Sequence, residues 1–116
     1  EFMISYNGYK TNCITIENGN AKVGDIVSID SDGKIYKSTK NQPFIGACVA
    51  VRGKYAVVQT DGYYEFRTVA TALNCGYRGF VAAGDNAIDI GDISAAGRTF
   101  LVLKYDGENK TVGIVL

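Results

Sequence analysis

The segment from Gln42 to Phe66 most constrains the fold, because it reads as extended strands separated by tight turns. Side chains alternate between the two faces of a strand. In residues 45–51, Ile, Ala and Val occupy one face, and Gly, Cys and Ala occupy the other. Fully buried strands carry apolar residues on both faces. We therefore expect Val49 to Val58 to lie in the centre of a sheet, with Cys48 as a small buried side chain.

Two glycine turns divide this segment. Arg52-Gly53-Lys54 separates residues 45–51 from a second alternating run, residues 55–60. Asp61-Gly62 follows that run, and its glycine accepts the positive φ that a type I′ turn requires. The sequence therefore predicts two consecutive hairpins, in which the strand that begins at Tyr63 runs back along residues 55–60.

Short alternating runs continue on both sides of this segment, and residues that favour turns bound each of them. The further expected strands are residues 13–17, 23–30, 34–38, 67–75 (ending in a loop), 80–82, 87–90, 99–105 and 111–116. Gly76–Gly79 and Ser94–Arg98 are expected as a turn and a loop. Gly-Asp followed by apolar residues occurs at Gly24 and again at Gly84, which suggests two related corners of a barrel.

Many short strands without a long helical pattern indicate an all-β fold, a small β-barrel or β-sandwich of short antiparallel strands with glycine turns. The 116 residues suit one domain with one core, which we expect to span residues 3–116. Residues 3–12 are expected to form an N-terminal arm or a small hairpin. Glu1-Phe2 reads as a remnant of a cloning site before a natural start at Met3.

The composition argues against several classes of function. Lys+Arg and Asp+Glu are both 12, so no excess positive charge favours DNA or an anionic membrane. Histidine is absent, which removes the usual general base and the commonest zinc ligand. The 3 cysteines have no CxxC spacing. No apolar run approaches the roughly 20 residues of a membrane helix. We expect a non-enzymatic protein without cofactor or metal, folded in a reducing environment.

Two acidic groups deserve comparison with metal sites. Residues 30–33 (Asp-Ser-Asp-Gly) partly match a calcium loop, but Ser28 and Thr39 stand where ligating carboxylates belong. A turn with an Asx hydrogen bond is the expected structure. The second group has a spacing that matches no cation loop, and we expect it to serve turns and the surface; its members are Asp85, Asp89 and Asp92.

Aromatic side chains are the candidate contact residues. The chain has 8 tyrosines, and tyrosine buries a large area at interfaces at little cost in entropy. Adjacent residues of a strand face opposite ways, so at least one of Tyr63 and Tyr64 is expected in the core. The candidates for an interface are Tyr6, Tyr9, Tyr63, Tyr64, Phe66 and Tyr77.

The order of these motifs carries a family resemblance. The chain reads Val-Gly-Asp-Ile-Val, Asp-Gly-Lys-Ile-Tyr, Phe-Ile-Gly-Ala-Cys-Val-Ala-Val-Arg-Gly, Tyr-Ala-Val-Val-Gln with Gly-Tyr, and finally Val-Gly-Ile-Val-Leu. It resembles the small capsid decoration or head-fibre-base proteins of tailed phages and of prophages in Gram-positive bacteria. The resemblance covers Cys13 to Leu116 and is strongest from Phe44 to Gly62.

This resemblance implies a virion structural protein on the outer capsid surface, made in the host cytoplasm. It implies a homotrimer that clamps major capsid protein subunits or anchors a head fibre, without nucleic-acid or membrane partners. A competing interpretation is a carbohydrate-binding or host-surface-binding β-module of a tail or fibre. A third is an SH3-like accessory domain of an enzyme.

Overall fold

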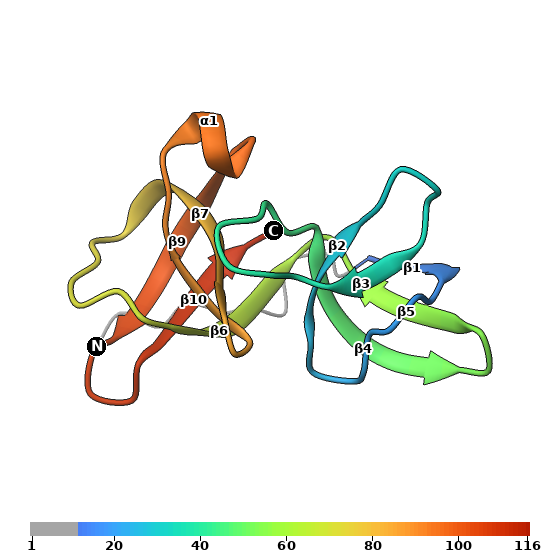
Figure 1. The fold of residues 1–116 in the computed structure, drawn as a ribbon. Coiled ribbons are helices and arrows are strands. Elements are labelled where there is room, and N and C mark those ends of the chain that lie inside the picture. Colours follow the sequence, from blue (N-terminus) through green and yellow to red (C-terminus); the bar gives the residue numbers. More distant parts are fainter. Residues whose placement is uncertain (1–11) are drawn as a thin grey trace.

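A computed structural model describes residues 12–116 of the chain, so the predicted arm and its Tyr6 and Tyr9 lie outside the described residues. The described part is almost entirely β-structure, which confirms the predicted all-β class (Figure 1). The elements are β1 (Cys13–Glu17), β2 (Ile26–Ile29), β3 (Ile35–Lys37), β4 (Gly46–Arg52), β5 (Tyr55–Gln59), β6 (Tyr63–Thr68), β7 (Gly76–Gly84), β8 (Ala87–Ile90), α1 (Ile93–Ala96), β9 (Thr99–Asp106) and β10 (Thr111–Val115).

The strands form two assemblies that follow one another along the chain. β1 to β5 make an antiparallel sheet in the order β1-β5-β4-β2-β3, and β6 to β10 make a closed barrel in the order β10-β6-β8-β7-β9. The barrel pairs are antiparallel except β6 with β8, which is parallel. The chain therefore passes from sheet to barrel at the link between β5 and β6, residues 60–62.

That link corrects the second predicted hairpin. Gly53 has a φ of 58° and joins β4 to β5 in a tight hairpin, as predicted. Gly62 also has a positive φ, 85°, but Asp61-Gly62 does not turn the chain back onto β5. Both sides of β5 are already occupied, by β1 and β4, and Tyr63 pairs instead with Val115 of β10. The prediction of a hairpin at this position is wrong.

Two further boundaries differ from expectation. Gly76–Gly79 is not a turn but the start of β7, where it pairs with β9 and completes the barrel wall. Position 79 requires glycine, because a Cβ there would lie 2.5 Å from the Gly91 carbonyl oxygen and would clash with it. Ser94–Arg98, expected as a loop, includes part of the single helical turn α1. The strand expected over residues 67–75 ends early, at Thr68.

β4 is the central strand of its sheet, as predicted, but only its first half is buried. Ala47 and Cys48 are fully enclosed, whereas Val49 and Val51 are 38% and 39% exposed. The pairing register with β5 shifts between Cys48 and Ala50, which leaves Val49 as the extra residue of a β-bulge. The bulge ends the strict alternation, so the expectation of a strand buried through Val58 without a solvated portion is wrong for the second half of β4.

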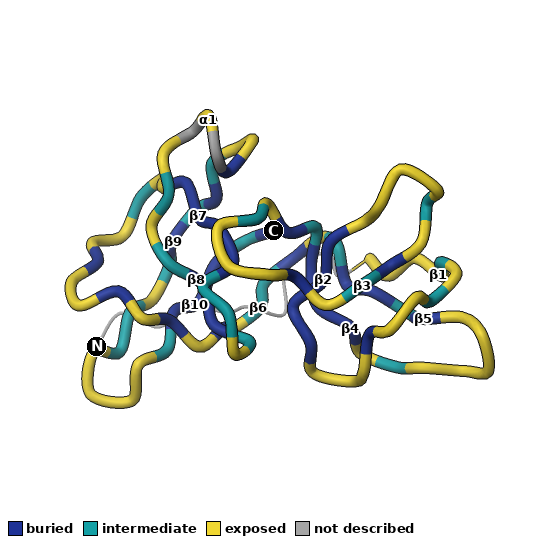
Figure 2. Tube along the Cα trace, viewed as in Figure 1, coloured by how far each residue is buried: buried dark blue, intermediate teal, exposed yellow. Residues whose placement is uncertain are grey.

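Buried positions lie along the strands of both the sheet and the barrel (Figure 2). The buried side chains form two hydrophobic clusters. One lies within the sheet, around Val27, Ile35 and Val58. The other fills the barrel and also includes Ile26 and Phe44, which come from the sheet half of the chain. The sheet and the barrel therefore share apolar core where they meet, at a contact that we call the joint.

Phe44 is the main apolar contact of the joint. It is 5% exposed and its ring stacks on Phe100 of β9 with 5.3 Å between centroids. Its centroid is also 5.5 Å from that of Phe66. The loop before it is fastened to β7, because the Asn41 amide donates to the Ala82 carbonyl (2.8 Å) and the Ala82 amide donates to the Gln42 carbonyl (2.9 Å).

The two Gly-Asp corners meet on the polar side of the joint. The Asn86 side-chain amide donates to Asp25 Oδ1 (3.0 Å), and the Ile26 amide donates to Asn86 Oδ1 (3.1 Å). Asp25 is 7% exposed, and its other oxygen accepts from the Lys22 amide (2.9 Å). The corners belong to different assemblies, one before β2 and one between β7 and β8, so they are not two corners of one barrel.

Candidate functional site

The outer wall of the barrel carries a row of apolar side chains that crosses four neighbouring strands. Tyr63 of β6 lies opposite Val115 of β10, Val115 lies opposite Leu101 of β9, and Leu101 lies opposite Tyr77 of β7. Residues directly opposite on one face of a sheet are in side-chain reach of each other. We call this set the wall row. Tyr77 is 70% exposed, the highest value among the large apolar side chains of residues 12–116 that protrude from the surface.

Tyr63 lies along the wall. Its hydroxyl donates to Glu65 Oε2 (2.9 Å), and that carboxylate is 3.7 Å from the Lys104 ammonium. Gly113 makes this possible, because a Cβ there would collide with the Tyr63 hydroxyl and ring. A glycine inside a strand marks such a close approach, so Gly113 within Val-Gly-Ile-Val was a signal that the sequence interpretation did not use.

The neighbouring aromatic residues of β6 point inward. Phe66 is 2% exposed and belongs to the barrel core, so it offers no surface for a partner. Tyr64 is half-buried, with its ring centroid 4.6 Å from that of Phe66. Tyr63 lies on the outer surface of β6 and Tyr64 packs against the barrel core, as the alternation of side chains along a strand predicts. Of the predicted interface residues, Tyr63 and Tyr77 both lie on the outer wall of the barrel, on strands that are not neighbours.

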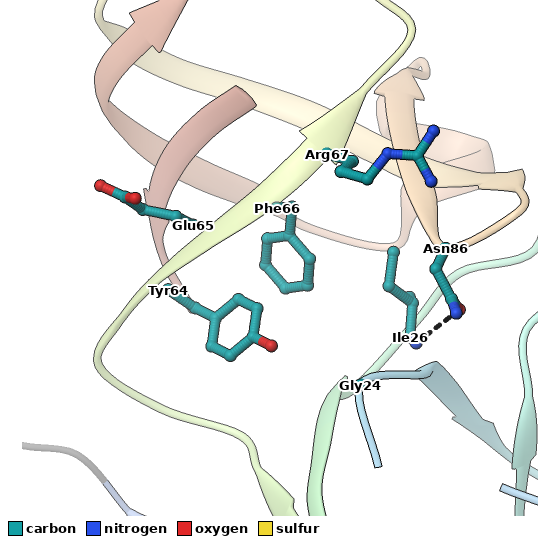
Figure 3. Close-up of a pocket in the computed structure, with 7 residues that line it drawn as sticks. All are labelled: Gly24, Ile26, Tyr64, Glu65, Phe66, Arg67 and Asn86. Carbon is teal, nitrogen blue, oxygen red and sulfur yellow. Dashed lines mark hydrogen bonds between the residues drawn. The ribbon is translucent and has the colours of Figure 1, made fainter. Parts of the chain in front are cut away.

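Tyr64 lines a hollow at the joint (Figure 3). The hollow has a volume of about 170 Å³ and is lined by Gly24, Ile26, Tyr64, Glu65, Phe66, Arg67 and Asn86. The side chain of Glu65 is directed away from it (Figure 3). Ligand pockets for whole small molecules usually measure about 300–1,000 Å³. This hollow therefore suits a single side chain or one sugar-sized group.

Burial raises the pKa of two groups, the Tyr64 hydroxyl and the Cys48 thiol. Partial burial, and secondarily the nearby Cys48 thiol, raises the pKa of the Tyr64 hydroxyl above its usual value. Burial is also the main cause that raises the pKa of Cys48. Tyr64 and Cys48 are therefore both neutral near pH 7, where a tyrosine and a thiol with unperturbed or raised pKa keep their protons.

Asp30, Asp89 and Asp92 accept hydrogen bonds from residues close to them in the sequence. Asp30 Oδ1 accepts from the amides of Asp32 and Lys34, each at 2.9 Å, which is the predicted Asx turn. Asp92 accepts from the Ser94 hydroxyl and Asp89 from the Ile90 amide. Over residues 12–116, no group of three His, Cys, Asp or Glu side chains is placed to hold a metal ion.

No helix in the described part of the chain has the length and apolar character needed to cross a membrane. Comparison of the chain with protein-family models, with curated proteins and with solved structures finds no match.

Proposed function

We propose that this chain is a structural protein of a phage or prophage virion that decorates the outer surface of the capsid. Two observations support the proposal. The motifs between Cys13 and Leu116 resemble those of capsid decoration and head-fibre-base proteins, and the wall row places apolar side chains, above all Tyr77, on the outside of a closed barrel. The observation that carries it is the 70% exposure of Tyr77 at the end of that row.

The wall row gives this function a physical basis. Exposed tyrosine on a rigid strand buries a large area when a partner covers it and loses little conformational entropy. Next to the wall row, Glu65 and Lys104 form an ion pair of opposite charges, and the formal net charge of the chain is +0. Such a protein is neither drawn to the packaged genome nor repelled by other copies. Several copies acting on repeated capsid subunits gain avidity, so each contact can be weak.

Co-sedimentation with capsids of the encoding phage tests this proposal. Tyr77→Ala is expected to reduce the fraction bound at least several-fold without changing the far-UV circular dichroism spectrum. Tyr55→Ala is the matched control, because Tyr55 is 43% exposed but lies in the sheet. Equal binding of the two variants, or no binding by the unmodified chain, contradicts the proposal. Light scattering on the free chain tests the homotrimer that the resemblance implies.

The alternative is a carbohydrate-binding module, and the hollow at the joint favours it. The Tyr64 ring lines the hollow, and its hydroxyl makes no hydrogen bond to another of residues 12–116. A sugar ring could stack on the aromatic face while its hydroxyls pair with this group. Tyr64→Phe keeps the ring and removes only the hydroxyl. A glycan that binds the unmodified chain and is lost in Tyr64→Phe, without capsid binding, would establish this alternative.

A further inference from the structure

Strand edges are almost completely occupied in the described part of the chain. The barrel is closed, and β2, β4 and β5 each have a neighbour on both sides. The outer edge of β3 is covered by the turn after β1. There the Gly19 amide donates to the Ile35 carbonyl (2.7 Å), and the Lys37 amide donates to Asn20 Oδ1 (3.0 Å). β1 and β3 are the two end strands of the sheet, and within residues 12–116 only β1 has an outer edge that no other segment covers.

The ladder between β1 and β5 shows which groups of β1 face outward. The Thr60 amide donates to the Asn12 carbonyl (3.1 Å), and the Asn18 amide donates to the Lys54 carbonyl (2.8 Å). Along an antiparallel strand, alternate residues bond to the partner and the residues between them point their amide and carbonyl groups away. Counting inward from both ends in steps of two, Ile14 and Ile16 bond to β5.

Cys13, Thr15 and Glu17 therefore direct their backbone groups outward. The bridge between Asn18 and Ile35 closes the edge beyond Glu17. Within residues 12–116, the uncovered part of the edge is the backbone of Cys13 and Thr15, with the Ile14 side chain, 42% exposed, between them.

Nothing in β1 protects this edge. Exposed edges are normally blunted by proline, lysine, a bulge or a covering segment. β1 has the sequence Cys-Ile-Thr-Ile-Glu, and its register with β5 is regular over all 5 residues. Unpaired backbone groups at this spacing are recognised by another extended strand.

We propose that β1 pairs antiparallel with β1 of a second copy of this chain, about a two-fold axis at Ile14. In this register Cys13 of each copy lies opposite Thr15 of the other, and the two residues exchange both of their backbone hydrogen bonds. Ile14 lies opposite Ile14 of the second copy in the closer, non-hydrogen-bonded type of pair, where cross-strand side chains make their best contact.

The sequence of β1 suits this occupant. No like charges come opposite each other near the axis, because the only charged residue of β1 is Glu17 at its end. The exposed Ile14 side chain covers its own symmetry mate. The chain as a whole has a net charge of +0, so two copies do not repel each other. The paired segment is short, and a small interface of this kind gives a weak, concentration-dependent dimer.

This inference goes beyond the proposed function and does not depend on it. β1 lies at the far end of the molecule from β7 and β9, which carry Tyr77 and Leu101 of the wall row (Figure 1). The two surfaces can therefore be occupied at the same time. A two-fold contact also differs from the three-fold association implied by the resemblance, so the two assemblies are distinguished by mass and by variant.

Disulfide trapping tests the register. In a background of Cys13→Ser and Cys75→Ser, Ile14→Cys places two thiols across the axis. The Cα atoms of such a pair are about 4.5 Å apart, within the range that a disulfide spans. Ile29→Cys is the matched control, because Ile29 is 44% exposed and lies on β2, where it pairs with Ile35 of β3. Mild oxidation of the concentrated protein should give at least several-fold more covalent dimer from Ile14→Cys.

Blocking the edge gives a second readout. Thr15→Pro removes an outward amide that β5 does not use, so the fold should persist, whereas Thr15→Val keeps the amide. Sedimentation should show loss of the dimer in Thr15→Pro alone. Equal cross-linking of Ile14→Cys and Ile29→Cys, or a dimer that survives Thr15→Pro, overturns the inference. A monomeric chain whose capsid binding is lost in Thr15→Pro also overturns it, because the edge then takes a strand of the capsid partner.

Discussion

Removal of the Phe44 ring should loosen the joint between sheet and barrel. The side chain is 5% exposed and contacts two other rings, those of Phe66 and Phe100. Truncation of a buried Phe to Ala costs about 3–5 kcal/mol, and each aromatic pair contributes about 0.5–1.5 kcal/mol beyond area burial. We expect Phe44→Ala to lower the free energy of unfolding by about 4 kcal/mol.

This loss is large against the whole stability of a small protein, which is about 5–15 kcal/mol. With about 2.1 cal/mol/K of unfolding entropy per residue, it should lower Tm by about 15 °C. Phe44→Leu is the control, because it keeps an apolar side chain and loses mainly the two ring pairs, so it should cost about 1–3 kcal/mol, less than Phe44→Ala.

Urea unfolding followed by both tyrosine fluorescence and far-UV circular dichroism measures the effect. The unmodified chain should unfold in one transition seen identically by the two probes. In Phe44→Ala the midpoint should fall, and a split transition would mean that the two assemblies have become uncoupled. A change of less than about 1 kcal/mol in Phe44→Ala would refute the assignment of Phe44 as the main contact of the joint.

Two further predictions follow from burial. The pKa of Tyr64 is raised in the folded protein, so above about pH 10 the unfolded chain loses this proton while the native protein keeps it, and stability falls as pH rises through the folded pKa. The urea midpoint should therefore drop more between about pH 8 and about pH 11 in the unmodified chain than in Tyr64→Phe; equal drops contradict the assignment. Cys13 and Cys75 are exposed and Cys48 is buried, so a thiol reagent should label two cysteines quickly and Cys48 only after unfolding. Rapid labelling of Cys48 in the native protein would contradict the placement of β4.

Local patterns predicted the strands well but not their neighbours. Cys13–Glu17 and the hairpin at Gly53 were predicted from alternation and turn residues, which are local properties. Gly53 and Gly62 carry the same local signal, yet only the first closes a hairpin. Which strand Tyr63 pairs with depends on the free edges left by distant strands, and a window of a few residues does not contain that information.

The candidate site shows the same division. Alternation in β6 predicted that one of Tyr63 and Tyr64 faces inward, and the structure shows Tyr64 doing so. The placement of Tyr63 and Tyr77 in one row around the barrel depends on the registers of β6, β10, β9 and β7 together. Phe66 was grouped with the surface residues because aromatic content alone does not distinguish a contact residue from a core residue.

The single passage of the chain from sheet to barrel has a mechanical consequence. A force applied at β1 and resisted at the barrel wall runs through both assemblies in series, since residues 12–116 cross from sheet to barrel once. Among the described residues, tension between the two assemblies passes through the link at residues 60–62 and through the non-covalent contacts of Asn41, Gln42, Phe44 and Asn86. The load that the joint bears is therefore set by a few ring contacts and hydrogen bonds, those of Phe44, Asn86 and the loop before Phe44.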